Sequence, residues 1–283
     1  MLCRSHEQRQ PALSMISIEP ITPDLGAEVR GVLGAGASRE QVATTLRRAL
    51  LRHHLLVVRA RILHPREQIA LATIFGQPVQ VPDPVIPEYP QILRVSNQRG
   101  EKNLNVGRHW HVDGTRAKNG TPISIWHVIQ HPAEGGDTLF ANMHRAYEEL
   151  PEDLRERVDG VQMVSVSGAT HALVKKHPAT QRKALYTSIR RTDHFVGMTK
   201  EETRVLLDRL DQHLSRPGSF YRHKWRVGDV VIGDNFSVAH QATPTDPRFP
   251  RILHRVTIRG GTAFYRPGAQ TSTVLQHAVH SDV

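Results

Sequence analysis

Short apolar runs bounded by turn residues constrain the fold of this chain more than any other feature of its sequence. Residues 230–232 are a β-branched run between glycine-containing segments at 228–229 and 233–235, which predicts a buried strand between two turns. Residues 251–258 alternate with a period of two, which predicts a second strand with two distinct faces. The C-terminal half of the chain is therefore expected to be rich in β-structure.

Capping boxes mark the two clearest helices. Ser38-X-X-Gln41 predicts a helix that runs to about residue 52, and Thr199-X-X-Glu202 predicts one that ends before Pro217. Further helices are predicted at residues 64–75, 143–150 and 152–158. Further strands are predicted at residues 55–58, 123–129, 138–141, 161–166 and 219–225. These elements indicate a mainly β protein with flanking helices, of the α+β class.

Composition agrees with one globular domain, which we expect over residues 16–267. Residues 1–15 are polar and lack an apolar core, so they are expected to be a disordered extension and not a secretory signal. Residues 268–283 are expected to be a flexible tail. No apolar run approaches the roughly 18 residues of a membrane span. The one cysteine, Cys3, excludes an internal disulfide and is typical of the cytoplasm, which is the expected compartment.

The formal net charge of +10 raises the alternative of a nucleic-acid-binding protein. The basic residues are scattered along the chain and form no lysine-rich block. Aromatic residues make up only 5% of the chain, too few to suggest a base-stacking platform. We therefore expect an arginine-rich solvated surface, with no nucleic-acid partner and no membrane partner.

The sequence His111-X-Asp113 is a candidate metal-binding pair. Side chains at positions i and i+2 of an extended chain lie on one face, so both can ligate one metal ion. One more histidine would complete the two-histidine, one-carboxylate set of non-haem Fe(II) oxygenases. The alternative is an exposed polar turn. A second such pair, at His280 and Asp282, has no histidine after it, and we interpret it as a coincidence in the C-terminal tail.

Arg251 and Arg255 project from one face of the strand predicted at residues 251–258. Two cations beside a metal ion would repel it unless anions lie between them, and the sequence offers no acidic partner at the matching positions. We therefore expect the carboxylates of bound ligands to supply the negative charge.

Several motifs in this order resemble the TauD/TfdA family, which contains taurine dioxygenase and 2,4-dichlorophenoxyacetate dioxygenase, over about residues 16–267. The motifs are Trp110-His111-X-Asp113, Gly135-Gly136-Asp137-Thr138, His177-Pro178, Trp225-X-X-Gly228-Asp229, Asp234-Asn235 with His240, and Arg251-X-X-His254-Arg255. The resemblance implies a double-stranded β-helix, or jelly roll, with helices packed outside one sheet and metal ligands at the barrel mouth.

The resemblance also implies a role for each matching residue. The three iron ligands would be His111, Asp113 and His240. Thr138 and Arg251 would bind the distal carboxylate of 2-oxoglutarate, and Arg255 would bind an acidic group of the substrate. The alternative for Arg255 is a second support for the cosubstrate.

The implied activity is that of an Fe(II)- and 2-oxoglutarate-dependent dioxygenase. Such an enzyme uses O2 to convert 2-oxoglutarate to succinate and CO2 while it hydroxylates, cleaves or desaturates its substrate. We expect a small organic anion, such as an amino-acid derivative or a biosynthetic intermediate, as the substrate. A homo-oligomer is one alternative for the assembly, and a monomer is the other. The alternatives are a metal-binding jelly roll without turnover and the nucleic-acid-binding protein considered above.

Departures from the taurine-specific enzyme make taurine a poor candidate substrate. Positions that would bind the sulfonate and amine of taurine are occupied here by Val81, Pro84 and Gly107. The shorter segment at residues 160–177 predicts a more open pocket, the alternative being that another loop covers it.

Three further histidines are expected to lie outside the ligand set. His109 would overfill a three-ligand site, and His127, on a core strand, is expected to be a hydrogen-bonded lining residue. His254 is expected to pack behind the site, because it lies on the opposite strand face from Arg251 and Arg255.

Overall fold

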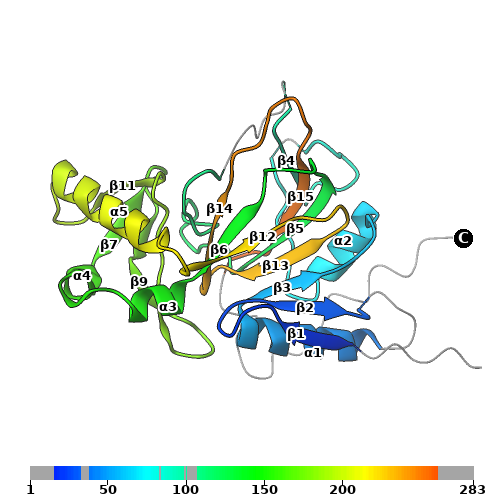
Figure 1. Ribbon diagram of the computed structural model, residues 1–283, viewed down its shortest axis with the longest axis horizontal. Helices are drawn as coiled ribbons and strands as arrows, with labels where there is room; N and C mark the ends of the chain where they lie inside the picture. The colour runs from blue at the N-terminus through cyan, green and yellow to red at the C-terminus, as the bar shows by residue number, and fades with distance from the viewer. Residues whose placement is uncertain (1–15, 33–37, 83, 99, 101–106, 261–283) are drawn as a thin grey trace, which may run out of the picture.

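The computed structural model describes residues 16–32, 38–82, 84–98, 100 and 107–260 (Figure 1). The predicted extension at residues 1–15 and the predicted tail at residues 268–283 lie outside the described residues. None of the helices in the described ranges has both the length and the apolar character needed to cross a membrane.

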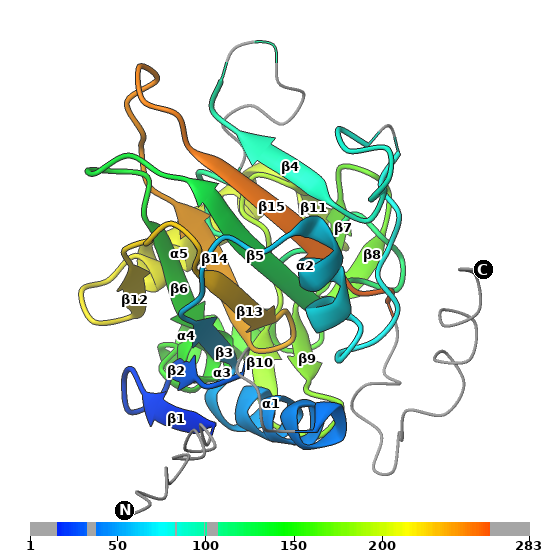
Figure 2. The ribbon, with the colours of Figure 1, turned by 90° about the vertical axis from the view of Figure 1, so that its right-hand side faces the viewer.

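Two sheets form the main body of the molecule (Figures 1 and 2). The larger sheet has seven strands, in the order β1 (Ser17–Pro20), β2 (Ala27–Arg30), β3 (Leu55–Val58), β13 (Val230–Asp234), β5 (Ile123–Gln130), β15 (Ile252–Thr257) and β4 (Leu93–Ser96). The smaller sheet has the order β12 (Phe220–His223), β6 (Thr138–Asn142) and β14 (Val238–Ala242). Within these two sheets only β2 and β3 pair in parallel. This is the jelly-roll core that the sequence predicted.

Alternation along the strands places apolar side chains on both faces of the larger sheet. Val231 of β13 packs with Trp126 and Phe140 in the core between the two sheets. Its neighbours Val230 and Ile232 belong to a second core, which is covered by α1 (Arg39–His53) and α2 (Pro65–Ala72). Because both faces are covered, β13 is a continuous apolar run and not an alternating one.

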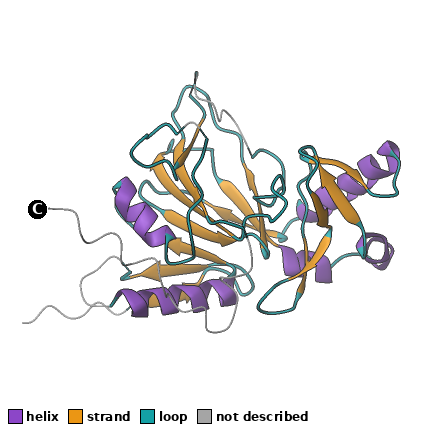
Figure 3. Ribbon diagram, turned by 180° about the vertical axis from the view of Figure 1, so that it is seen from behind, coloured by secondary structure: helices purple, strands orange, loops and turns teal. Residues whose placement is uncertain are grey.

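A second lobe packs beside the smaller sheet (Figures 1 and 3). It contains α3 (Met143–Glu148), α4 (Glu152–Val158), α5 (Lys200–Leu214), the sheet of β11 (Thr192–Phe195), β7 (Gln162–Ser165) and β8 (Thr170–Ala172), and the pair β9 (Val174–Lys176) and β10 (Lys183–Leu185). Trp110 and Val112 are buried in the core of this lobe, together with Ala239 of β14. This core therefore anchors both sides of His111.

The predicted elements are present, with differences at their ends. The capping boxes at Ser38 and Thr199 are both formed, and they begin α1 and α5 as expected. The helix predicted at residues 64–75 ends at Ala72, because the chain turns at residues 73–75 before Gly76. Several strands were not predicted, namely β1, β2, β4, β8, β9, β10, β11 and β14. Most are only three or four residues long, too short to establish a period.

Buried neutral histidines make the stability of this fold sensitive to acid. His127 of β5 accepts a hydrogen bond from the backbone N–H of Leu63, and burial together with the charge of His254 lowers the pKa of His127 to about 4. In the unfolded chain His127 binds a proton near pH 6.5, whereas in the folded chain it binds one only near pH 4. The free energy of unfolding should therefore fall as the pH falls through this window, by up to roughly 3 kcal/mol for this residue.

Urea unfolding of His127→Gln at several pH values tests this expectation. The variant should show a smaller loss of stability between pH 6.5 and about 4 than the parent protein. His194→Gln is the matched control, because His194 lies half-exposed on β11. An unchanged pH dependence in His127→Gln would contradict the assignment.

Candidate metal centre and cosubstrate pocket

His111 and His240 are joined directly through their backbones. The N–H of His111 donates to the carbonyl of His240 over 3.1 Å, and the N–H of His240 donates to the carbonyl of His111 over 2.9 Å. His111 therefore forms an isolated bridge and does not lie on the extended strand that the His-X-Asp spacing suggested. His240 lies in the middle of β14. Reciprocal bonds of this kind fix the two residues directly opposite each other.

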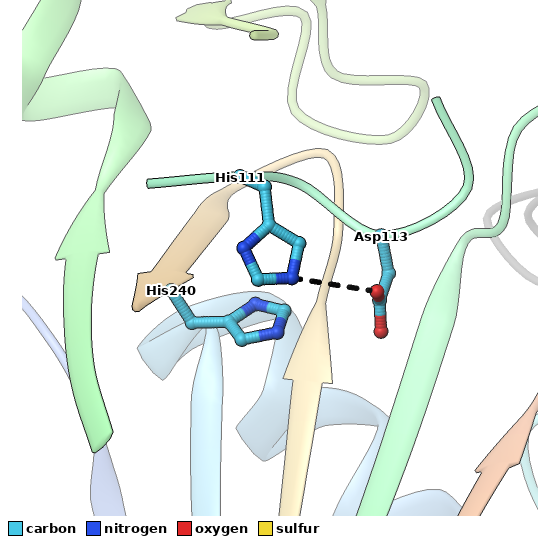
Figure 4. Close-up of side chains that lie close together, drawn as sticks. All are labelled: His111, Asp113 and His240. Atoms are coloured by element: carbon cyan, nitrogen blue, oxygen red, sulfur yellow. Dashed lines mark ion pairs between the residues drawn. The ribbon is translucent and has the colours of Figure 1, made fainter. Parts of the chain in front are cut away.

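The side chains of His111, Asp113 and His240 meet at one point (Figure 4). One nitrogen of each imidazole and one oxygen of the carboxylate all lie within 4.8 Å of one another. His111 Nε2 is 3.9 Å from Asp113 Oδ1, and the centroids of the two imidazole rings are 4.1 Å apart. All three residues are buried. A buried set of two nitrogen donors and one carboxylate can hold a divalent metal ion.

The protonation of the two histidines suits metal binding. His111 Nδ1 lies 2.8 Å from the carbonyl of His109, which can only accept, so Nδ1 carries the proton and Nε2 presents a lone pair. Burial lowers the pKa of both His111 and His240, so both rings are neutral at pH 7. His109 is exposed, as expected for a residue outside the ligand set.

Ser124 and Arg255 contact the Asp113 carboxylate, and Asn235 supports Ser124. Ser124 Oγ donates to Asp113 Oδ2 over 2.8 Å, and Asn235 Nδ2 donates to Ser124 Oγ over 3.0 Å. Arg255 NH1 lies 2.9 Å from Oδ1 and 3.1 Å from Oδ2. Burial alone would raise the pKa of Asp113, but the charge of Arg255, helped by the hydrogen bond from Ser124, lowers it below its usual range.

The contact between Arg255 and Asp113 corrects one expectation from the sequence. The absence of an acidic partner was inferred from positions along the strand, whereas Asp113 reaches Arg255 from a segment 142 residues away. Arg251 differs from Arg255, because among the described residues it forms no ion pair with a carboxylate. The expectation that the carboxylate of a bound ligand balances an arginine charge therefore applies to Arg251.

Arg251 and Thr138 are neighbours in the same cavity. Arg251 is only 9% exposed, and its Nε donates to the carbonyl of Gly136 over 2.7 Å. Thr138 Oγ1 accepts from Arg251 NH2 over 3.3 Å and from Trp225 Nε1 over 3.0 Å. Burial lowers the pKa of Arg251 to about 10, which still leaves it charged at pH 7. A buried cation beside a hydroxyl group is an arrangement that binds a carboxylate.

Gly136 makes this arrangement possible. Its φ is +68°, and a Cβ at this position would lie 2.9 Å from Arg251 Cδ. Any side chain at Gly136 would therefore displace the arginine.

One cavity connects the metal-binding cluster to Arg251. Five of the six residues singled out from the sequence line it, namely His111, His240, Thr138, Arg251 and Arg255, and Asp113 lies beside it in contact with Arg255. The apolar part of the wall includes Trp126, Phe140, Trp225 and Leu253. A pocket with apolar walls and a few convergent polar groups is typical of a small-molecule site.

Sequence analysis did not identify two residues that orient this site. Ser124 supports Asp113, and its signal was a small polar residue inside an otherwise apolar strand. Trp225 supports Thr138, and it appeared only as part of a longer motif. His254 lies outside the cavity lining, as expected. His127 was expected to be a lining residue, but it also lies outside the lining and accepts a hydrogen bond from the N–H of Leu63.

A jelly roll with two neutral imidazoles and a carboxylate at one end is the architecture of a non-haem metal oxygenase. The family model described as "Taurine catabolism dioxygenase TauD, TfdA family" matches residues 17–257. The chain belongs to this family, as its motifs predicted.

Individual relatives agree with this assignment. An alpha-ketoglutarate-dependent sulfate ester dioxygenase of Pseudomonas putida is 29% identical over 87% of this chain and 90% of the relative. A (S)-phenoxypropionate/alpha-ketoglutarate-dioxygenase of Sphingobium herbicidovorans is 31% identical over 87% of this chain and 96% of the relative. The crystal structure of a taurine dioxygenase from Burkholderia xenovorans superposes with a TM-score of 0.76 at 32% identity, covering 87% of this chain and 90% of that one.

The protein is therefore an α-ketoglutarate-dependent dioxygenase, an oxidoreductase that uses Fe(II), 2-oxoglutarate (α-ketoglutarate) and O2. The predicted reaction class and cofactors are confirmed. The relatives act on different small molecules, so the family does not define the substrate.

Metal binding to the folded protein should stabilise it, and His111→Ala should remove this effect. At a Mn(II) concentration of about 100 times Kd, the ion stabilises the protein that binds it by roughly 2.7 kcal/mol. His109→Ala is the control, because its exposed ring lies only two residues away. The measurement is thermal unfolding with and without Mn(II). Equal stabilisation of His111→Ala and His109→Ala would contradict the site.

Proposed function

We propose that this protein oxidises a C–H bond of a small organic anion at a ferrous ion held by His111, Asp113 and His240. The proposal is carried by one observation, the buried contact of 3.9 Å between the lone pair of His111 Nε2 and the Asp113 carboxylate. Two electron-pair donors this close, with no proton between them, leave room for a cation. Bound iron would supply the activation of O2 for the oxidation of 2-oxoglutarate and substrate.

In this proposal Thr138 and Arg251 bind the distal carboxylate of 2-oxoglutarate. Thr138 Oγ1 already accepts two N–H bonds, from Trp225 and Arg251, so its own O–H is free to donate to an anion. Arg251 is charged and buried, and an anion would offset the cost of burying that charge. Trp225 orients the hydroxyl group and closes the apolar wall of the pocket.

Arg255 is the proposed contact for the acidic group of the substrate. It lines the cavity beside His111, and its Nε is buried without a hydrogen-bond partner among the described residues. An incoming anion would satisfy this donor. The substrate and not the cosubstrate is the preferred partner, because Arg255 contacts Asp113 whereas Arg251 contacts Thr138.

The proposed substrate is not taurine. Gly107 lines the cavity, and a Cβ there would lie 3.2 Å from His111 Cε1, so the position has no side chain that could contact a substrate amine. The relatives named above include enzymes for sulfate esters and phenoxypropionate, both of which are organic anions. An amino-acid derivative or biosynthetic intermediate with an acidic group fits the same site. Hydroxylation next to a heteroatom would lead to cleavage of the product.

The alternative of a metal-binding module without turnover is disfavoured. A module that only held metal would not need the buried arrangement of Arg251, Thr138 and Trp225, which costs free energy in the absence of an anion.

Asp113→Ala should abolish succinate formation. Anaerobic addition of Fe(II) and 2-oxoglutarate to the wild-type protein should produce a weak visible charge-transfer band, and the variant should lack it. Replacement of Ser124 by Ala is a graded comparison, since it removes one hydrogen bond to the same carboxylate and should weaken metal binding by about 10-fold to 100-fold. Undiminished succinate release by Asp113→Ala would refute its role as a ligand.

Replacement of Arg251 and replacement of Arg255 should change different KM values in steady-state kinetics. Arg251→Leu should raise KM for 2-oxoglutarate by about 10-fold to 100-fold, because it removes a charge-assisted contact. Arg255→Leu should raise KM for the substrate and leave KM for 2-oxoglutarate nearly unchanged. The opposite pattern would make Arg255 a cosubstrate residue.

A further inference from the structure

A turn from the second lobe lies against the metal-binding cluster. Ser188 forms an isolated bridge with His111, and the N–H of Ile189 donates to the carbonyl of Trp110 over 3.0 Å. The turn is closed by Thr192 Oγ1 and by the N–H of Arg191, which both donate to the carbonyl of Ser188. Arg191 is therefore held next to the site, although it is 80 residues from His111 in the sequence.

The charge of Arg191 acts on the same residues as that of Arg255. Burial first, and then the nearby charges that include Arg191 and Arg255, lower the pKa of His111 and His240. Burial also lowers the pKa of Arg191 itself, while the negative charge of Asp113 opposes this effect. Two arginines thus lie close to one carboxylate.

Among the described residues, Arg191 has no partner for its guanidinium. The residue is half-buried, and within the described ranges its side chain forms neither a hydrogen bond nor an ion pair. Asp113 is already bonded to Arg255 NH1 and Ser124 Oγ. A half-buried arginine with five unused N–H donors, in a turn bonded to Trp110 and His111, can bind an anion.

The summed charge of the occupied site supports the same conclusion, which rests on the proposed function. The charges of Fe(II) and Arg251 would be balanced by those of Asp113 and the two carboxylates of 2-oxoglutarate. The sum then leaves an excess of two positive charges, which equals the charge of Arg191 and Arg255, although Arg255 also contacts Asp113. A monoanionic substrate would leave one of them unbalanced in a partly desolvated site.

We propose that Arg191 and Arg255 together bind a dianionic part of the substrate, either one tetrahedral group such as a phosphate monoester or two neighbouring carboxylates. The two arginines come from different elements, Arg255 from β15 and Arg191 from the turn before β11 whose backbone is bonded to Trp110 and His111. Together they can donate to several oxygens of one substrate. Arg191 is thus a specificity-determining residue contributed by the second lobe.

The test is a comparison of matched ligands with the anaerobic enzyme that holds Fe(II) and 2-oxoglutarate. An alkyl phosphate and an alkyl sulfate of the same chain length differ by one charge at about pH 8, since the second pKa of a phosphate monoester is about 6. Benzylsuccinate and 3-phenylpropionate form a second pair, which differs by one carboxylate. Calorimetry measures each Kd, and persistence of the charge-transfer band shows that 2-oxoglutarate has not been displaced.

The wild-type enzyme should bind the dianion of at least one pair about tenfold more tightly than the monoanion. Arg191→Leu should lose this preference, and Arg191→Lys should retain part of it. Arg190→Leu is the matched control and should keep the full preference, because Arg190 is the exposed neighbour in the same turn. The pair that shows the preference identifies the group.

Two results would overturn the inference. One is the absence of a preference for the dianion in both pairs, and the other is an equal loss of preference in Arg190→Leu and Arg191→Leu, which would indicate a general surface field. Either result with an intact charge-transfer band leaves the proposed function standing. The absence of the band from the wild-type enzyme would refute the proposed function and this inference together.

Discussion

The reciprocal backbone hydrogen bonds between His111 and His240 are the constraint on which the site depends. They attach a segment without regular structure to the middle of β14. The same segment is fixed from the other side, because Trp110 and Val112 are buried in the core of the second lobe. The metal-binding cluster is thus set by the packing of that lobe on the jelly roll, and rigid support of this kind is what a site with open coordination positions requires.

Charge organises the rest of the cavity. Asp113 is kept ionised by Arg255, while Arg251 is buried beside Thr138 and pairs with no carboxylate of the described residues. The cluster of His111, Asp113 and His240 is therefore flanked by two arginines, and bound anions would balance the excess positive charge. This would link stability to the proposed function, since the groups that cost free energy without an anion are the ones proposed to bind ligands. The proposed role of Arg191 in binding the substrate follows the same pattern.

Much of the fold follows from local patterns. Capping boxes located α1 and α5, an apolar run located β13, and a period of two located β15. Strand β14 could not be found in this way, because it has no alternating pattern and is defined by its pairing with β6. The residues of the site were identified through motifs, but their contacts were not: the pairing of Arg255 with Asp113 joins segments 142 residues apart, and Arg191 belongs to no motif. Such contacts depend on how the lobes pack, which single-sequence periods do not encode.

The central claim is that His111, Asp113 and His240 hold one ferrous ion while Arg251 and Thr138 hold the distal carboxylate of 2-oxoglutarate. The most direct measurement is a crystal structure of the protein grown anaerobically with Fe(II) and 2-oxoglutarate, with the metal located by anomalous scattering at the iron edge. The account predicts a single iron bonded to all three side chains, with the far end of 2-oxoglutarate against Arg251. Iron bound without Asp113, or 2-oxoglutarate oriented toward Arg255 instead, would contradict it.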